Sequence, residues 1–165
     1  MAINLDKSLK QALDRIESTD YKEFLVHNPE VKREWHNSDR IMEVYGDLKW
    51  KLIGLLNETY STSFSLENWL KNQKDEVSYF LNEAGSNVLS YSEFKAPFKF
   101  HLWLGKKGFV IGIEQKGQGF DAEKVDHLRL KENEGAAFDF FRNATSEIFF
   151  DNKNEAKIIF MEYLI

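Results

Sequence analysis

The sequence predicts an α/β (α+β) two-layer sandwich, with helices on one face of a mixed, mainly antiparallel sheet and a helical extension at the N-terminus. Two patterns indicate this class. Between Val77 and Val88, apolar residues recur at steps of three and four, which is typical of an amphipathic helix. After Pro97 the apolar period changes to two over 98–104 and again over 109–113, and a turn with glycine at both ends joins the two runs. We therefore expect a helix followed by a β-hairpin.

Composition narrows the class of protein. The 165 residues suit one domain with a modest extension, and 42% hydrophobic residues are enough for a core. The chain has no Cys, which excludes disulfides, thiolate zinc sites and Cys nucleophiles and is consistent with a cytoplasmic protein. Net charge is −5 with both signs interspersed, so we expect no nucleic-acid partner. No apolar run approaches the roughly 20 residues of a membrane span, so we expect no membrane association.

The N-terminal extension, 1–46, is expected to be helical. Apolar residues at 5, 9, 13 and 16 indicate an amphipathic helix. A cap at 18–20, with Glu23 three residues after Asp20, predicts a second, short helix that ends near Asn28. Pro29 suits the first turn of a third helix.

The domain that follows, 47–165, begins inside a longer helix that Ser38 can cap. Gly46 and Gly54 each weaken this helix by roughly 1 kcal/mol, and a break is expected at Gly46. After a polar loop at 59–65, Ser65 caps the helix that continues to Ser90. Further along, we expect a polar stretch at 121–134, a helix at 136–146, and two last strands joined by a turn at 151–154.

One face of the predicted sheet is too apolar for a solvated surface. Opposite the main helices it would carry Trp103, Val110, Ile159, Met161 and Tyr163. We expect the N-terminal helices, or a second copy of the chain, to cover this face. The alternative is that these residues are singly exposed.

Three short stretches carry a further pattern. They are Glu83-Ala84-Gly85-Ser86-Asn87 on the helix, Gln115-Lys116-Gly117-Gln118-Gly119 after the hairpin, and Gly135-Ala136-Ala137 at the start of a later helix. Their order resembles the histidine-kinase-like ATPases, the superfamily of gyrase B, sensor kinases and MutL, and is most similar to the anti-sigma-factor serine kinases. The resemblance covers roughly Leu48 to the C-terminus and implies a Bergerat-type ATP-binding domain.

The resemblance implies roles for seven residues in binding ATP and Mg²⁺. Glu83 would be the general base, and Asn87 the Mg²⁺ ligand through its side-chain oxygen. The 115–119 loop would hold adenine through Gln115, with Gly117 and Gly119 allowing close backbone approach. Phosphate would lie at the Gly135 turn, beside Ala137, and the stretch 121–134 would be the nucleotide lid. The alternatives are an exposed helix Glu, an Asn bonded to nearby backbone, and a plain turn.

Two residues depart from the family pattern. Gln115 stands where the family has Asp, although a Gln amide oxygen can accept from the adenine amino group. Ala137 stands where the family has a second glycine, and its methyl group lies where phosphate oxygens would approach. His27 and His36 are either phosphoacceptors, which sensor kinases carry N-terminal to such a domain, or ordinary helix-end residues; the second is favoured because neither stands in the acidic-flanked H-box of those kinases.

The resemblance implies an ATP-binding regulatory module that phosphorylates a Ser or Thr of a protein partner, or sequesters that partner. The alternative is a nucleotide-free descendant of the fold, acting by protein–protein interaction or phosphotransfer and forming a homodimer through its N-terminal helices. A third possibility is a fortuitous resemblance in an α+β domain of another function.

Overall fold

The computed structural model describes residues 3–26, 38–65, 67, 75–91, 97–132 and 143–165. Within them, side chains are described except at 38–42, 85–91, 97–98 and 128–132. None of the helices in these ranges is long and apolar enough to cross a membrane.

The centre of the molecule is a five-stranded sheet in the order β1-β2-β3-β5-β4. Its strands are β1 (Ser18–Leu25), β2 (Pro97–Gly105), β3 (Gly108–Gln115), β4 (Glu147–Phe150) and β5 (Ile158–Leu164). Each neighbouring pair is antiparallel, and the parallel contact seen is a single bridge between Ile3 and Ile148. The fold is therefore α+β with an open antiparallel sheet, and the expected hairpin and last two strands are confirmed.

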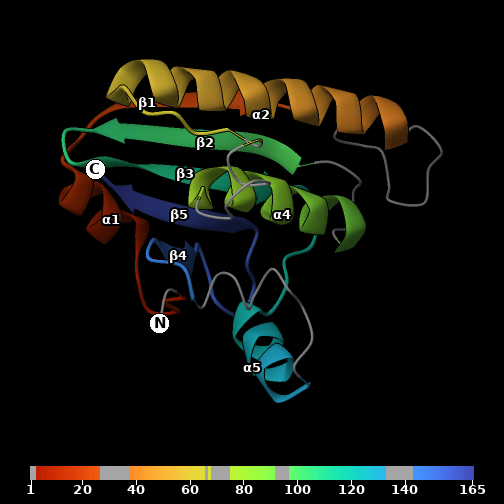
Figure 1. Cartoon of the computed structure of the whole chain (residues 1–165). Helices are drawn as coiled ribbons and strands as arrows, with labels where there is room; N and C mark the ends of the chain where they lie inside the picture. Colours follow the sequence, from red (N-terminus) through yellow and green to blue (C-terminus); the bar gives the residue numbers. More distant parts are fainter. Residues whose placement is uncertain (1–2, 27–37, 66, 68–74, 92–96, 133–142) are drawn as a thin grey trace.

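Two helices cover one face of this sheet. They are α2 (Ser38–Tyr60) and α4 (Glu76–Tyr91), and Figure 1 shows both lying along the strands. Their buried residues, such as Leu52, Leu56, Phe80 and Leu81, form one cluster with the inward side chains of the sheet. α2 is continuous through Gly46, so the expected break there is wrong. A Cβ at Gly46 would meet no atom within 4 Å, so packing does not require glycine there.

A third helix, α1 (Leu9–Ile16), lies on the opposite face. Ala12 and Ile16 pack there with Val110, Phe149 and Phe160. α1 therefore adds a partial third layer to the expected two-layer sandwich. The expectation that an N-terminal helix covers the outer face is confirmed, and Trp103 packs against the same cluster.

The faces of β5 are the reverse of the expected ones. Ile159 and Met161 are buried in the α2–α4 core, and Tyr163 packs against it. The outward residues are Phe160, which packs under α1, and Glu162. Both alternating sets of this strand are mostly apolar, so the period of two identifies the strand without identifying its faces.

Residues 18–25 form a strand where a helix was expected. Glu17 ends α1 in a left-handed conformation with φ of 53°, which turns the chain toward the sheet. The N–H of Lys107 then donates to the Ile16 carbonyl at 3.0 Å, joining the end of α1 to the β2–β3 turn. Strand pairing from Ser18 to Leu25 therefore overrides the local capping signal at 18–20.

The remaining expectations fall partly on described residues. α4 begins at Glu76, and Asp75 caps it by accepting from the Ser78 N–H at 2.9 Å. The polar stretch contains a helix, α5 (Ala122–Glu132), and Asp151–Asn154 lie between the last strands as expected. The following expectations lie outside the described residues: the third helix, His27, His36, most of the helix at 136–146, and positions 66 and 68–74 of the helix that was expected to continue from Ser65 to Ser90.

Candidate functional site

α4 carries the first candidate residue, Glu83, and is fixed to the sheet at its N-terminal end. The Glu76 carboxylate accepts from the Thr145 N–H at 2.7 Å and from the Ser146 hydroxyl at 2.6 Å, which ties the first turn of α4 to the start of β4. Val77, Phe80, Leu81 and Ala84 then bury one side of the helix. Because these four positions face the core, the Glu83 side chain lies at the margin of the buried face and is half-buried.

Tyr79 lies one turn before Glu83. Burial raises the pKa of Tyr79, and the nearby negative charge of Glu83 raises it further. The two side chains therefore share one local environment. A carboxylate at that position is chemically able to accept a proton, as a general base must.

A buried lysine lies between α2 and α4, and the sequence analysis missed it. Lys49 donates from Nζ to the Asn82 side-chain oxygen at 3.3 Å and lies 5.8 Å from the centre of the Tyr45 ring. Burial lowers the pKa of Lys49. The Tyr45 hydroxyl donates to the Leu81 carbonyl. The Asn82 side chain therefore faces α2.

The loop after β3 is closed by hydrogen bonds of its own. Gln115 is buried at the end of the strand, and its backbone N–H donates to the Lys157 carbonyl at 2.9 Å. Its side-chain Nε2 donates to the Gln118 carbonyl at 2.7 Å. Gly117 has φ of 98°, a conformation that glycine adopts without steric cost.

Gly119 is required by close packing. A Cβ at this position would lie 2.9 Å from the Ala156 carbonyl oxygen. The next residue, Phe120, exchanges two backbone hydrogen bonds with Ala156, at 3.0 and 2.7 Å. These contacts attach the Gly-x-Gly loop to the segment that precedes β5, so the glycine has a structural role whether or not a ligand binds.

The structure places the predicted site residues unequally. Glu83 lies on α4, which packs on one face of the sheet, and Gln115 ends β3 within the sheet; Figure 1 shows the C-terminal ends of α4 and β3 at the same end of the molecule. Asn87 lies in the last two turns of α4, but only its backbone is described. Gly135 and Ala137 lie outside the described residues.

A second group of polar and aromatic side chains lies on the outer face, beyond α1. The Tyr21 hydroxyl is 2.6 Å from Nδ1 of the buried His101, and His101 Nε2 is 3.4 Å from the Glu114 carboxylate. Trp103 stacks on His101 with ring centres 5.5 Å apart. The sequence analysis missed His101 because alternation marks it only as an outward strand position.

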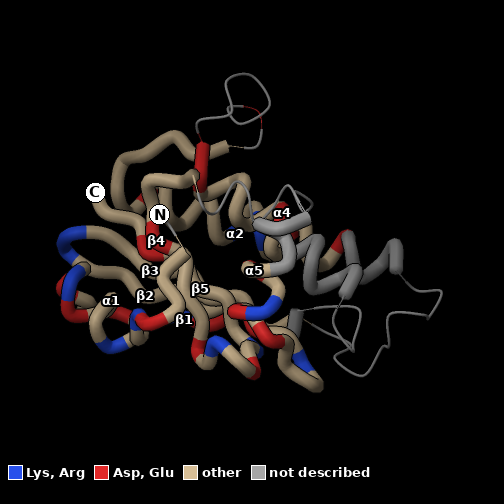
Figure 2. The backbone as a smooth tube through the Cα atoms, turned by 90° about the horizontal axis from the view of Figure 1, so that it is seen from below, with Lys and Arg blue, Asp and Glu red and all other residues tan. Residues whose placement is uncertain are grey.

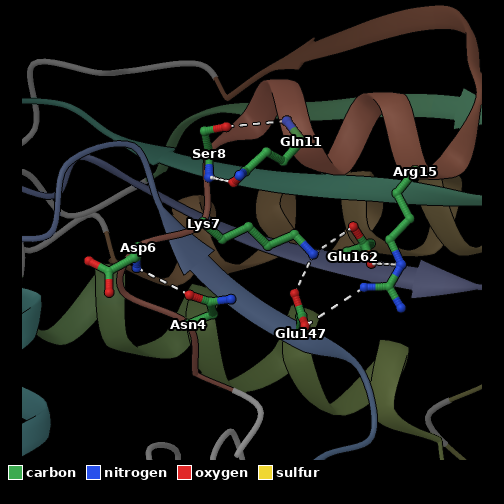
Figure 3. Close-up of polar contacts among 8 residues, drawn as sticks. All are labelled: Asn4, Asp6, Lys7, Ser8, Gln11, Arg15, Glu147 and Glu162. Carbon is green, nitrogen blue, oxygen red and sulfur yellow. Dashed lines mark hydrogen bonds and ion pairs between the residues drawn. The ribbon is translucent and has the colours of Figure 1, made fainter.

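A buried ion cluster joins the N-terminal segment to the last two strands (Figure 3). Lys7 Nζ lies 2.8 Å from a Glu162 oxygen and also contacts Glu147. Arg15, on α1, reaches the same two carboxylates at 3.5 and 3.8 Å. Each of the four charges faces opposite charges within the cluster, which attaches α1 and the segment before it to the sheet.

Charges elsewhere on the described chain show no separation by sign. Figure 2 shows Lys and Arg interspersed with Asp and Glu on α1 and α5. Among the described side chains, no three His, Asp or Glu residues are grouped as a metal site. Comparison with protein-family models, with curated proteins and with solved structures found no match.

Proposed function

We propose that this chain is an ATP-binding regulatory module similar to the anti-sigma-factor serine kinases, with a histidine-kinase-like variant of the α+β architecture. One observation carries the proposal: α4, which bears Glu83 and Asn87, ends at the same end of the molecule as β3, where the loop that begins at Gln115 starts. ATP with Mg²⁺ would lie between them and the Gly135–Ala137 turn.

The hydrogen bond at Gln115 supports adenine recognition. Its Nε2 donates to the Gln118 carbonyl at 2.7 Å, which orients the amide. Oε1 then acts as the acceptor for the adenine amino group, the task of Asp in the resembling family. Gln in place of the family's Asp at position 115 thus removes a negative charge from the site but keeps an oxygen that accepts a hydrogen bond from adenine.

Glu83 would take the proton of a Ser or Thr hydroxyl on a protein partner. A general base must be accessible from the ligand side, and the half-buried side chain meets that need. Asn87, one turn further along α4, would place its oxygen on Mg²⁺, and the ion would neutralise charge on the phosphates.

Calorimetric titration with a non-hydrolysable ATP analogue, with and without Mg²⁺, tests the proposal. We expect micromolar, Mg²⁺-dependent binding that Asn87→Ala abolishes. Asn82→Ala is the matched control, because Asn82 is on the same helix but faces Lys49. Glu83→Gln should keep binding and lose phosphoryl transfer. No heat up to millimolar nucleotide, or equal effects of the two Asn variants, would contradict the ATP site.

The second candidate is a nucleotide-free adaptor with the same fold. The observation in its favour is that the 115–119 loop already makes contacts inside the chain: Gln118 accepts from Gln115, and Gly119 packs against Ala156. A loop held by such contacts needs no ligand to be ordered. The same titration distinguishes the two candidates, because the adaptor would give no heat of binding with the nucleotide. The adaptor would also bind a protein partner with the same affinity in the presence and in the absence of ATP.

A further inference from the structure

The outer edge of the sheet is formed by β1, which pairs with β2 on one side. On its other side, no strand among the described residues pairs with it. All its side chains are exposed apart from the half-buried Phe24. An edge strand of eight residues presents a row of backbone donors and acceptors on which another strand can form a ladder.

Apolar side chains border this edge on both faces. Phe24 packs against the α2–α4 core on one face, and Lys51 of α2 lies over its ring at 5.8 Å. On the other face, Tyr21 and Leu25 are 43% and 54% exposed. The Tyr21 ring is held in place, because it lies 5.0 Å from the Trp103 ring and its hydroxyl contacts His101. The edge therefore offers a fixed aromatic surface beside a strand backbone that no described strand pairs with, and within that backbone the Tyr21 N–H donates to the Asp20 side chain at 2.9 Å.

The charges on β1 are complementary to those of a second β1 in one register. Asp20 and Lys22 project from the same face of the strand, 3.8 Å apart and each about half exposed. In an antiparallel pair with a two-fold axis at Tyr21, Asp20 of each copy lies opposite Lys22 of the other. The two Tyr21 side chains then become cross-strand neighbours, a favourable aromatic pair.

Other positions of the two-fold axis along β1, each of which leaves the α2–α4 faces of the two sheets on the same side, bring like charges together. An axis at Lys22 places Lys22 opposite itself, and an axis at Glu23 places Glu23 opposite itself. Like charges directly opposite are destabilising in a sheet. We propose that a second copy of this chain docks antiparallel along β1, centred on Tyr21, and joins the two five-stranded sheets into one continuous sheet. The contact is isologous, as in most homodimers.

A charge-reversal set tests this register by sedimentation velocity over a range of protein concentrations. The wild type should form a dimer. Asp20→Lys and Lys22→Asp should each be monomeric, because each creates like-charge pairs across the axis. A mixture of the two single variants should dimerise again, since each Lys then faces an Asp. Lys10→Asp, an exposed change on α1, is the control that should remain dimeric.

A cross-linking experiment checks the centre of the register independently. The chain has no cysteine, so Tyr21→Cys introduces a single thiol. Directly opposite residues in an antiparallel pair have Cα atoms about 4.5–5.5 Å apart, a separation that a disulfide can span. We expect mild oxidation to give a covalent dimer of Tyr21→Cys and none of Trp50→Cys, an exposed position on α2.

Three outcomes would overturn the proposal. One is a monomeric wild type at about 100 μM. Another is a dimer that survives both single charge reversals, and the third is a pair of single variants that does not recombine on mixing. Circular dichroism of each variant establishes that it is folded. Nucleotide binding is measured separately, so a negative titration with ATP would leave this interface untouched.

Discussion

Replacing Lys7 with Met should destabilise the fold through the carboxylate that it leaves behind. Glu162 is 2% exposed, and the Lys7 ammonium group lies 2.8 Å from it. Removing one partner of a buried ion pair costs roughly 3–5 kcal/mol. Arg15 still lies 3.5 Å from Glu162 after the change, but it is half exposed, so we expect the lower end of that range, about 3 kcal/mol.

The double variant Lys7→Met/Glu162→Met distinguishes a lost attraction from an unpaired charge. When both members of a buried pair become apolar residues of similar volume, the change is often neutral or stabilising. We expect the double variant to lie within about 1 kcal/mol of the wild type and to be more stable than Lys7→Met alone. Lys10→Met on α1 is the control: its pair with Asp14 is exposed, at 86% and 70%, and is worth roughly 0.3–0.5 kcal/mol.

Urea unfolding followed by tryptophan fluorescence and by circular dichroism gives these free energies. For a chain of this size, a loss of about 3 kcal/mol also lowers the melting temperature by roughly 6–12 °C. The reasoning is refuted if Lys7→Met lies within about 0.5 kcal/mol of Lys10→Met, or if the double variant loses the sum of the two single losses.

Further predictions concern other buried groups. Tyr60→Phe should cost about 1–2 kcal/mol in urea unfolding, because the hydroxyl lies 2.9 Å from both the Gly105 and Gly108 carbonyls and accepts from the Gly105 N–H at the β2–β3 turn. Gly119→Ala should destabilise through the 2.9 Å contact with Ala156, whereas Gly54→Ala, with open space around it, should stabilise by roughly 0.5–1 kcal/mol. Lys49→Met should raise the melting temperature at pH 7. Burial lowers the pKa of Lys49 in the folded state, so the charged Lys49 destabilises the fold fully below that lowered pKa and progressively less as pH rises toward the unfolded pKa. The gain in melting temperature from Lys49→Met should therefore shrink as pH approaches 10. A gain that does not change with pH would contradict this reasoning.

Elements with one strong period were predictable from the sequence. The β2–β3 hairpin has alternation on both arms and glycine at 105 and 108, and it forms as expected. The apolar stripe at 9, 13 and 16 predicts α1, in which Ile16 is buried and Leu9 and Leu13 pack against the same cluster. In these segments, local pattern and tertiary packing favour the same structure.

Segments with competing signals were not predictable. Ser18 to Asp20 resembles a helix cap, yet pairing with β2 makes this segment the start of β1, and that partner lies far along the chain. Both faces of β5 are apolar, so nothing local assigns Ile159 to one face and Phe160 to the other. Favourable contacts distant in sequence decided both.

The candidate site divides in the same way. The apolar stripe at Val77, Phe80, Leu81 and Ala84 predicts the buried side of α4, so the half-buried position of Glu83 beside it was predictable. Lys49, His101 and Lys7 were missed, since their importance depends on partners from other elements. A single charged residue in a helix or a strand gives no local sign that it will be buried.

The pairing of β1 with β2 has a consequence for how the protein is made. Thr19 lies beside Leu104, 85 residues further along the chain. At translation rates of roughly 5–20 residues per second, β1 leaves the ribosome about 4–17 seconds before the strand that pairs with it. During that interval Tyr21, Phe24 and Leu25 belong to a nascent segment whose neighbouring strand has not yet been synthesised. β1 must therefore wait for the hairpin, and the sheet can close only when most of the chain has emerged.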